Sequence, residues 1–436
     1  SGGQLSLNNN VTGTSIEGSG TINNTATGTF IANGDNVSSI FASNFGGTDT
    51  GADAVFNNAG TFRKSGSAET NTTTVDVALN NTGTVDVQTG ILNLTNGGTH
   101  TGAFTGSGTI GFGGGTQTLN AGANVSTQNV SFSGGTTDVN STYNVSGKTT
   151  ISGGVANING SLASLGSELN ITNGELNINT ANASVGSLTQ SGGSLSGTGT
   201  VTITGPSDIT FGDHRSTGTT ILQGASTISS SGFQLDGGRV LRNENTLTWS
   251  GGQLSLNNNV TGTSIEGSGT INNAATGTFI ANGENASFIF ANNFGGTDTG
   301  ADAVFNNAGT FRKSGSDATN TTTVDVAFNN TGTVDVQTGI LNLSNDSTQS
   351  GSISIDNGAT LRFGGGTHTF NTSTTNINGQ LELTTGNLSF AAPHTITGTG
   401  SFNQSSGTVQ GADLTIASTA NFTFGDNRGT GTTILQ

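Results

Sequence analysis

Four aspartates, in two pairs, have a spacing that could bind a metal ion. The segment GGTDTGADAVFNN occurs at Gly46 to Asn58 with Asp49 and Asp53, and recurs at Gly295 to Asn307 with Asp298 and Asp302. Carboxylate oxygens suit Ca²⁺, but the segment matches neither an EF-hand nor the glycine-aspartate nonapeptide of calcium-binding β-rolls. The pattern therefore indicates a weak calcium site or a loop that contacts a neighbouring molecule. A solvated loop without a ligand is the alternative.

Aromatic and basic residues near these segments complete a candidate interaction surface. A phenylalanine precedes each aspartate pair, and the motif TFRKSGS places an Arg-Lys pair shortly after it. Paired basic side chains could meet acidic groups on an adjacent molecule. The candidates are Phe45, Asp49, Asp53, Arg63, Lys64, Phe294, Asp298, Asp302, Arg312 and Lys313.

The four histidines, His100, His214, His368 and His394, are candidates for catalysis or metal binding. His100 aligns with Gln349, and His214 aligns with Asn427, in the other copy of an internal repeat. Neither position keeps its chemistry within the molecule. We therefore predict that the histidines are exposed turn residues without a catalytic or metal role.

The elements that must position these residues belong to a long internal repeat. Residues 1–102 recur as 250–351, with 13 differences among 102 positions. Repeats of this kind indicate a stacked array, in which every unit contacts only its neighbours. We predict one continuous solenoid over 1–436, with a first long unit at 1–249 and a shortened, incomplete second unit at 250–436. We also expect the array to continue in a much longer protein.

Composition narrows the class of protein. The chain has 72 glycines among 436 residues, 30% hydrophobic residues and only 8% charged residues. Its 23 phenylalanines and regularly placed aliphatic residues argue against disorder. A net charge of −16 argues against nucleic-acid binding, and the absence of cysteine excludes disulfides and thiolate metal sites. We also expect no membrane contact within this segment.

Apolar residues come mostly in pairs one residue apart, which places both members on one face of a strand. Glycine, asparagine, threonine and aspartate lie between the pairs and favour tight turns. The pairs include Val75/Val77, Val85/Val87, Leu92/Leu94, Ile110/Phe112, Leu169/Ile171, Leu176/Ile178, Val201/Ile203, Leu381/Leu383 and Phe422/Phe424. The sequence therefore predicts an all-β chain of very short strands and turns.

One stretch shows the spacing of these strands. Phe233/Leu235, Val240, Leu247/Trp249 and Leu254/Leu256 begin seven residues apart. A coiled coil also has a period of seven, but it needs helix formers, which are scarce here. We predict a three-sided parallel β-helix with roughly 20 to 24 residues per coil.

Asparagine pairs recur just before strand starts, at Asn57/Asn58, Asn80/Asn81, Asn306/Asn307 and Asn329/Asn330. Aligned asparagine side chains can hydrogen-bond from coil to coil, and asparagine accepts left-handed backbone angles. We therefore interpret them as ladders at the turns.

Several repeated motifs resemble those of a known group of proteins. FNNAGTF (Phe56 to Phe62), NNTGTVDVQTGILNL (Asn80 to Leu94) and GSGTI (Gly18 to Ile22) are similar to the stalks of very large bacterial surface proteins. These are the filamentous-haemagglutinin-like adhesins and autotransporter passenger domains. The resemblance implies a right-handed parallel β-helix, secretion and a stalk or adhesive role. It assigns no catalytic residue.

We predict a structural or adhesive extracellular fibre segment that acts as a rigid spacer and is not an enzyme. Expected partners are neighbouring copies in a bundle and cell-surface glycans, with no cofactor other than weakly bound calcium. The alternative is a carbohydrate-active β-helix enzyme, since β-helix polysaccharide lyases use Arg or Lys as a base beside carboxylates that hold Ca²⁺. Such a site needs several converging carboxylates, whereas Asp76, Asp86, Asp325 and Asp335 alternate with inward valines and should face solvent.

Overall fold

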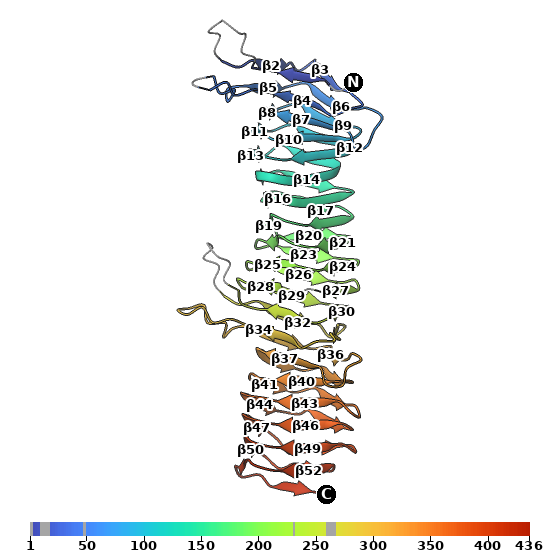
Figure 1. The fold of residues 1–436 in the computed structure, drawn as a ribbon, viewed down its shortest axis with the longest axis vertical. Helices are drawn as coiled ribbons and strands as arrows, with labels where there is room; N and C mark the ends of the chain where they lie inside the picture. The colour runs from blue at the N-terminus through green and yellow to red at the C-terminus, as the bar shows by residue number, and fades with distance from the viewer. Residues whose placement is uncertain (1–2, 9–17, 47–48, 230–231, 259–266) are drawn as a thin grey trace. The chain divides into compact units, whose positions relative to one another are not determined.

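The computed structural model is a parallel β-solenoid of about 19 turns. It describes residues 3–8, 18–46, 49–229, 232–258 and 267–436. These residues form strands and turns without a helix, so none of them belongs to a helix that could cross a membrane. The chain divides into two compact units, Ser1–Thr202 and Ile203–Gln436, and Figure 1 shows the coils stacked within each. The predicted repeat boundary after residue 249 lies inside the second unit.

Three strands make one coil in the first unit. Each strand pairs in parallel with the strand three positions further along the chain: β5 with β8, β6 with β9 and β7 with β10. These strands are β5 (Val55–Asn58), β6 (Thr61–Lys64), β7 (Thr72–Asp76), β8 (Ala78–Asn81), β9 (Thr84–Val87) and β10 (Ile91–Leu94). The predicted three-sided parallel coil is confirmed.

The second unit repeats this arrangement. The same pairing joins β35 to β38, β36 to β39 and β37 to β40. The strands are β35 (Val304–Asn307), β36 (Thr310–Lys313), β37 (Thr321–Asp325), β38 (Ala327–Asn330), β39 (Thr333–Val336) and β40 (Ile340–Leu343). The named strand pairings in the described part of the chain are parallel. Isolated antiparallel bridges occur at Gly46/Asp49, Asp236/Ser268 and Gly295/Asp298.

Coil length varies with the turns and not with the strands. Thr72 pairs with Ile91 and Ile340 pairs with Thr360, which are steps of 19 and 20 residues. Val55 pairs with Ala78, a step of 23 residues. The coil that carries Gly295 to Asn307 is much longer, since Thr270 pairs with Val304, 34 residues away. The predicted length therefore suits the plain coils but misses the coils with insertions.

The interior consists of alternate residues from every strand. The predicted inward pairs are buried, including Val75/Val77, Leu92/Leu94, Leu176/Ile178 and Leu381/Leu383. Two predictions are wrong. Leu241 is buried in place of Val240, and Phe422 and Phe424 in the last coil are exposed.

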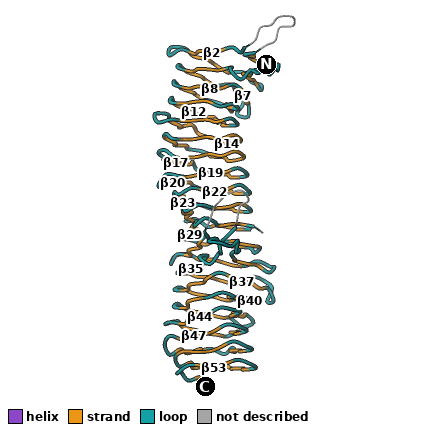
Figure 2. The backbone as a smooth tube through the Cα atoms, turned by 90° about the vertical axis from the view of Figure 1, so that its left-hand side faces the viewer, coloured by secondary structure: helices purple, strands orange, loops and turns teal. Residues whose placement is uncertain are grey.

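Longer strands in the first unit turn a corner without leaving the ladder. They are β12 (Ala103–Phe112), β14 (Asn124–Val139) and β16 (Lys148–Ile158). Gly135 and Gly154 lie at equivalent corners with φ of 65° and 68°, a conformation that favours glycine. Figure 2 shows the usual alternation of short strands and turns elsewhere.

Phenylalanine rings stack along the interior of the second unit. The ring of Phe305 lies 5.1 Å from Phe279, 5.3 Å from Phe311 and 5.5 Å from Phe328, centroid to centroid. Each fully buried phenylalanine contributes about 1.5–3 kcal/mol through the hydrophobic effect. A continuous apolar column thus stabilises the stack without disulfides.

Candidate functional site

Each copy of the repeat projects an excursion with an exposed phenylalanine at its tip. In the second copy it connects β34 (Ser287–Phe290) to β35 and protrudes from the stack (Figure 1). The backbone N–H of Phe294 donates to Asp298 (2.9 Å), and that of Asp298 donates to Gly295 (3.1 Å), which closes a tight turn. The side chain of Phe294 is 44% exposed.

The first copy builds the same turn. The N–H of Phe45 donates to Asp49 (2.9 Å), and Phe45 is 43% exposed. Gly47 and Thr48 lie outside the described residues. The predicted interaction surface therefore contains exposed phenylalanines in both copies.

The aspartates hold the base of each excursion. Asp49 is buried and accepts a hydrogen bond from Nδ2 of Asn8 (2.8 Å). Asp302 accepts from the N–H (3.2 Å) and hydroxyl (2.7 Å) of Ser268, and these hydrogen bonds lower the pKa of the carboxyl. Asp53 contacts Ser19 in the same way, and its pKa is lowered for the same reason. The contacts fasten the excursion to the chain segment that precedes it in the coil.

The described residues contain no group of three or more His, Cys, Asp or Glu side chains that could hold a metal ion. Calcium binding by Asp49, Asp53, Asp298 and Asp302 therefore remains a prediction. We expect addition of calcium or of a chelator to leave the melting temperature unchanged, because serine and asparagine donors already occupy three of the four carboxylates. A calcium-dependent rise in melting temperature that Asp298→Asn abolishes would contradict this expectation.

The arginines of the basic pairs form ion pairs within their own stack. Arg63 lies one coil from Asp86, with Nε 3.2 Å from Oδ2, and Arg312 lies 2.9 Å from Asp335 in the second copy. Both arginines are partly exposed, so each ion pair contributes little to stability. Asp76 and Asp325 face solvent as predicted, and Asp86 and Asp335 are partly exposed.

The lysines of the same pairs are buried, so they cannot belong to the predicted interaction surface. Lys64 is 0% exposed and follows Phe62 on the inward face of β6, in register with Ala32 and Val87. Its ammonium donates to the carbonyl of Ser65 (3.0 Å), and burial lowers its pKa. Lys313 repeats this arrangement with Ser314 (2.9 Å). The alternation of β6 indicates the inward position, but the charge suggested the surface.

The prediction that the histidines are exposed is also wrong. His100 and His368 are 0% exposed inside the stack. Nε2 of His100 lies 2.9 Å from Gln117, and Nδ1 of His368 lies 2.9 Å from Ser347. Desolvation lowers the pKa of each to about 4.

The other two histidines have similar surroundings. Nε2 of His394 lies 3.0 Å from the hydroxyl of Thr375, and burial lowers the pKa of His394 to about 4. Nδ1 of His214 lies 3.2 Å from Thr220, and burial holds the pKa of His214 well below its usual range. Strand alternation could have revealed these positions, since His368 and His394 lie two residues before the buried Phe370 and Ile396. The four histidines act as neutral core residues.

Asparagine ladders run inside and outside the stack. Nδ2 of Asn273 donates to Asn307 (2.7 Å), and Nδ2 of Asn307 donates to Asn330 (2.8 Å). The neighbouring Asn306 accepts from Asn329 (3.0 Å) on the outer face. The predicted ladders are confirmed, although the residues end strands and do not lie in the turns.

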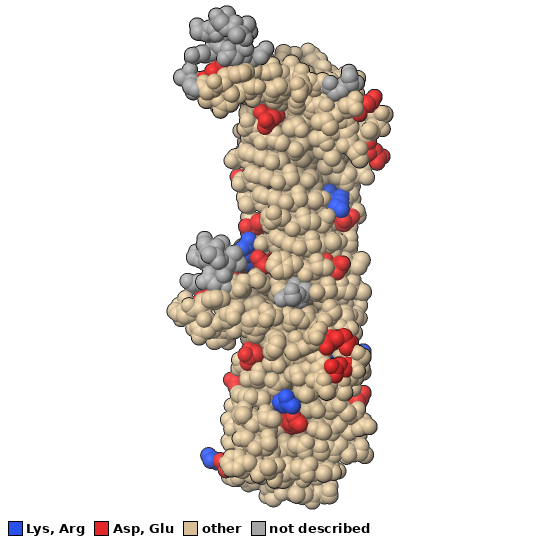
Figure 3. Space-filling view, viewed as in Figure 1, with Lys and Arg blue, Asp and Glu red and all other residues tan. Residues whose placement is uncertain are grey.

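The surface carries few charges. On the face drawn in Figure 3, acidic and basic side chains are scattered among uncharged residues. One hollow of about 390 Å³ in the first unit is lined by Glu69, Gln88, Thr89, Gly90, Ser107, Gly108, Thr109, Gln128 and Asn129. Glu69 is its one carboxylate, whereas a lyase-like site needs several.

These features define a class: the chain is a β-solenoid repeat protein with projecting excursions. Comparison with protein-family models, curated proteins and solved structures finds no match.

Proposed function

We propose that the chain is a structural or adhesive segment of a bacterial cell-surface protein. In this proposal the solenoid acts as a rigid extracellular spacer, and the excursions contact neighbouring molecules or surface glycans. The observation that carries the proposal is the duplicated excursion: both copies present an exposed phenylalanine on a hydrogen-bonded turn anchored to the stack. The similarity of the repeat motifs to adhesin stalks supports the same role.

The inter-coil hydrogen bonds support the mechanical part of the proposal. Parallel ladders and asparagine side chains connect successive coils within each unit. A load along the stack is shared by many such bonds, none of which depends on a cofactor. A spacer of this kind keeps its surface features at fixed intervals.

Immunoelectron microscopy of the source cells tests the location and the form of the protein. An antibody against the excursion Phe294 to Ala303 should label thin fibres outside the cell. Label confined to the cell interior, or to compact particles that cleave polysaccharides in a glycan-degradation assay, would refute the proposal and favour the carbohydrate-active enzyme.

Replacing the two tip phenylalanines with serine tests the contact role. We expect Phe45→Ser with Phe294→Ser to reduce self-association or glycan binding at least about tenfold, while stability changes by no more than about 0.5 kcal/mol. Phe288→Ser is the matched control. Phe288 is 41% exposed on β34, outside the tip, and Ser39 stands at the equivalent position of the first copy.

Sedimentation velocity and glycan-array binding provide the readouts. Unchanged association and unchanged glycan binding in the double variant would refute the contact role. An equal loss in Phe288→Ser would show that any exposed phenylalanine matters.

A further inference from the structure

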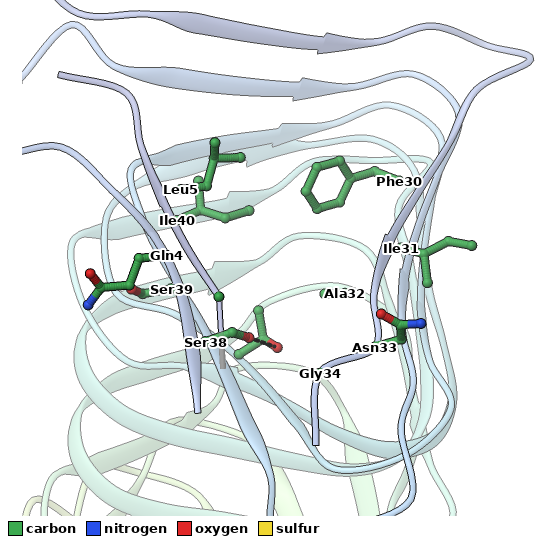
Figure 4. Close-up of a pocket in the computed structure, with 12 residues that line it drawn as sticks. Gln4, Leu5, Phe30, Ile31, Ala32, Asn33, Gly34, Ser38, Ser39 and Ile40 are labelled. Carbon is green, nitrogen blue, oxygen red and sulfur yellow. Dashed lines mark hydrogen bonds between the residues drawn. The ribbon is translucent and has the colours of Figure 1, made fainter. Parts of the chain in front are cut away.

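The first described coil presents an open apolar face. It is formed by β1 (Gln4–Ser6), β2 (Thr21–Asn24) and β3 (Thr29–Ala32), which pair on one side with β4 (Ser38–Phe41), β5 and β6. A hollow of about 270 Å³ lies at this face, and Figure 4 shows Leu5, Phe30 and Ile40 around it. Leu5 is 39% exposed and Ile31 is 51% exposed.

The second copy contains the same three strands with a cover. They are β31 (Gln253–Ser255), β32 (Thr270–Asn273) and β33 (Thr278–Ala281), and their sequences are identical to those of β1, β2 and β3. Leu254, Ile271 and Phe279 are at most 1% exposed. Because the strands are identical, the difference in exposure comes from the coil that covers them.

The cover consists of three short strands that immediately precede residue 250. They are β28 (Phe233–Leu235), β29 (Val240–Asn243) and β30 (Thr246–Trp249), and they pair in parallel with β31, β32 and β33. Leu241 meets Ile271 and Leu247 meets Phe279 in register. The ring of Trp249 lies 6.2 Å from that of Phe279.

One polar contact adds selectivity to this interface. Nδ2 of Asn243 donates to Oδ1 of Asn273 (2.8 Å) and so extends the inner asparagine ladder. Asn24 is the equivalent of Asn273, and its Nδ2 donates to Asn58 (2.7 Å). An incoming asparagine would continue the ladder at Asn24 in the same way. An apolar residue there would forgo this hydrogen bond.

We propose that the face of β1, β2 and β3 is a docking site for a parallel three-strand coil of polypeptide. The coil that fits has the inward pattern of Phe233 to Trp249: Phe and Leu on the first strand, Leu and Asn on the second, and Leu and Trp on the third. It binds by adding a strand to each of three exposed edges, and its apolar side chains fill the hollow beside Leu5 and Phe30. The inference rests on the coil geometry and not on an extracellular role.

The test joins a second copy of Gly224 to Trp249 directly before Ser1 of the full chain. The junction Trp249–Ser250 already exists in the protein, so the local sequence at the joint is native. Hydrogen exchange of the amides in β1, β2 and β3 is then compared with that in β31, β32 and β33 of the same molecule. In the parent chain we expect β1 to β3 to exchange at least about tenfold faster, and in the extended chain we expect this difference to disappear.

The control extension carries Leu241→Asp and Leu247→Asp in the added segment alone. These changes place two carboxylates against the apolar hollow, so the extension should remain unprotected and give no protection to β1 to β3. Equal protection by the native and control extensions, or none by the native extension, would overturn the inference. Neither result bears on where the protein is located, which the microscopy tests separately.

Discussion

Lowering the pH from about 6.5 to about 4 is expected to destabilise the protein strongly through its buried histidines. The pKa values of His100, His368 and His394 fall from 6.5 to about 4 because burial disfavours the charged imidazolium. In the unfolded chain these side chains titrate near their ordinary pKa of about 6.5. As the pH falls below that value, the unfolded state binds protons that the folded state cannot bind. Each histidine then costs roughly 3 kcal/mol of stability once the pH reaches about 4.

The repeat itself supplies conservative replacements for two of the histidines. His100→Gln and His214→Asn each introduce the residue that stands at the equivalent position of the other copy, Gln349 or Asn427. We expect the double variant to melt at a less pH-dependent temperature between pH 6.5 and 4 than the parent chain. Circular dichroism melts at several pH values measure this difference.

Other titrating groups require that the variant be compared with the parent at each pH. Burial raises the pKa of Asp236 to about 6, so its protonation in the folded state adds stability as the pH falls. Asp53 and Asp302, whose pKa values are lowered, lose their contribution at still lower pH. These effects are common to both proteins. Parallel pH profiles for the variant and the parent would contradict the role of the histidines.

Replacing Asn307 with aspartate is expected to cost about 3 kcal/mol or more. Asn307 is buried, donates from Nδ2 to Asn330 (2.8 Å) and to the carbonyl of Thr333 (2.9 Å), and accepts from Asn273. Aspartate has the same shape but cannot donate when ionised. It also brings a carboxylate close to two acceptor oxygens in the interior.

The adjacent residue provides the control, because Asn306 belongs to the outer ladder and is partly exposed. Asn306→Asp should cost less than about 1 kcal/mol, since water can solvate its carboxylate. Chemical denaturation of both variants measures the two free energies. Equal losses would show that the inner ladder is no more important than the outer one.

The apolar half of the fold follows directly from the sequence. Val75/Val77 and Leu92/Leu94 alternate with polar residues, and strands of this kind can bury only one face. The tandem repeat and the turn residues then favour stacked coils over a sandwich. The three-sided coil and the asparagine ladders were predictable for these reasons.

The polar half of the interior was not predicted, because charge and polarity were given more weight than alternation. Lys64 follows Phe62 by two residues and His368 precedes Phe370 by two, so both lie on the inward face. Their polar atoms reach partners that sequence separation hides: Lys64 reaches a backbone carbonyl at a corner, and His368 reaches Ser347 one coil earlier. Excursion geometry was likewise hidden, since it depends on contacts such as Asp302 with Ser268, 34 residues apart.

Disulfide trapping tests the parallel stacking of coils most directly, because the chain has no native cysteine. Thr310, Thr333 and Ser352 occupy successive coils of one column, in which Thr310 pairs with Thr333 and Thr333 pairs with Ser352. Cysteines at 310 and 333, or at 333 and 352, should form a disulfide, since paired residues on adjacent strands lie within disulfide reach. Cysteines at 310 and 352 are two coils apart, about 10 Å, and should stay reduced. Oxidation of the 310/352 pair, or failure of both adjacent pairs, would contradict the stacked coil.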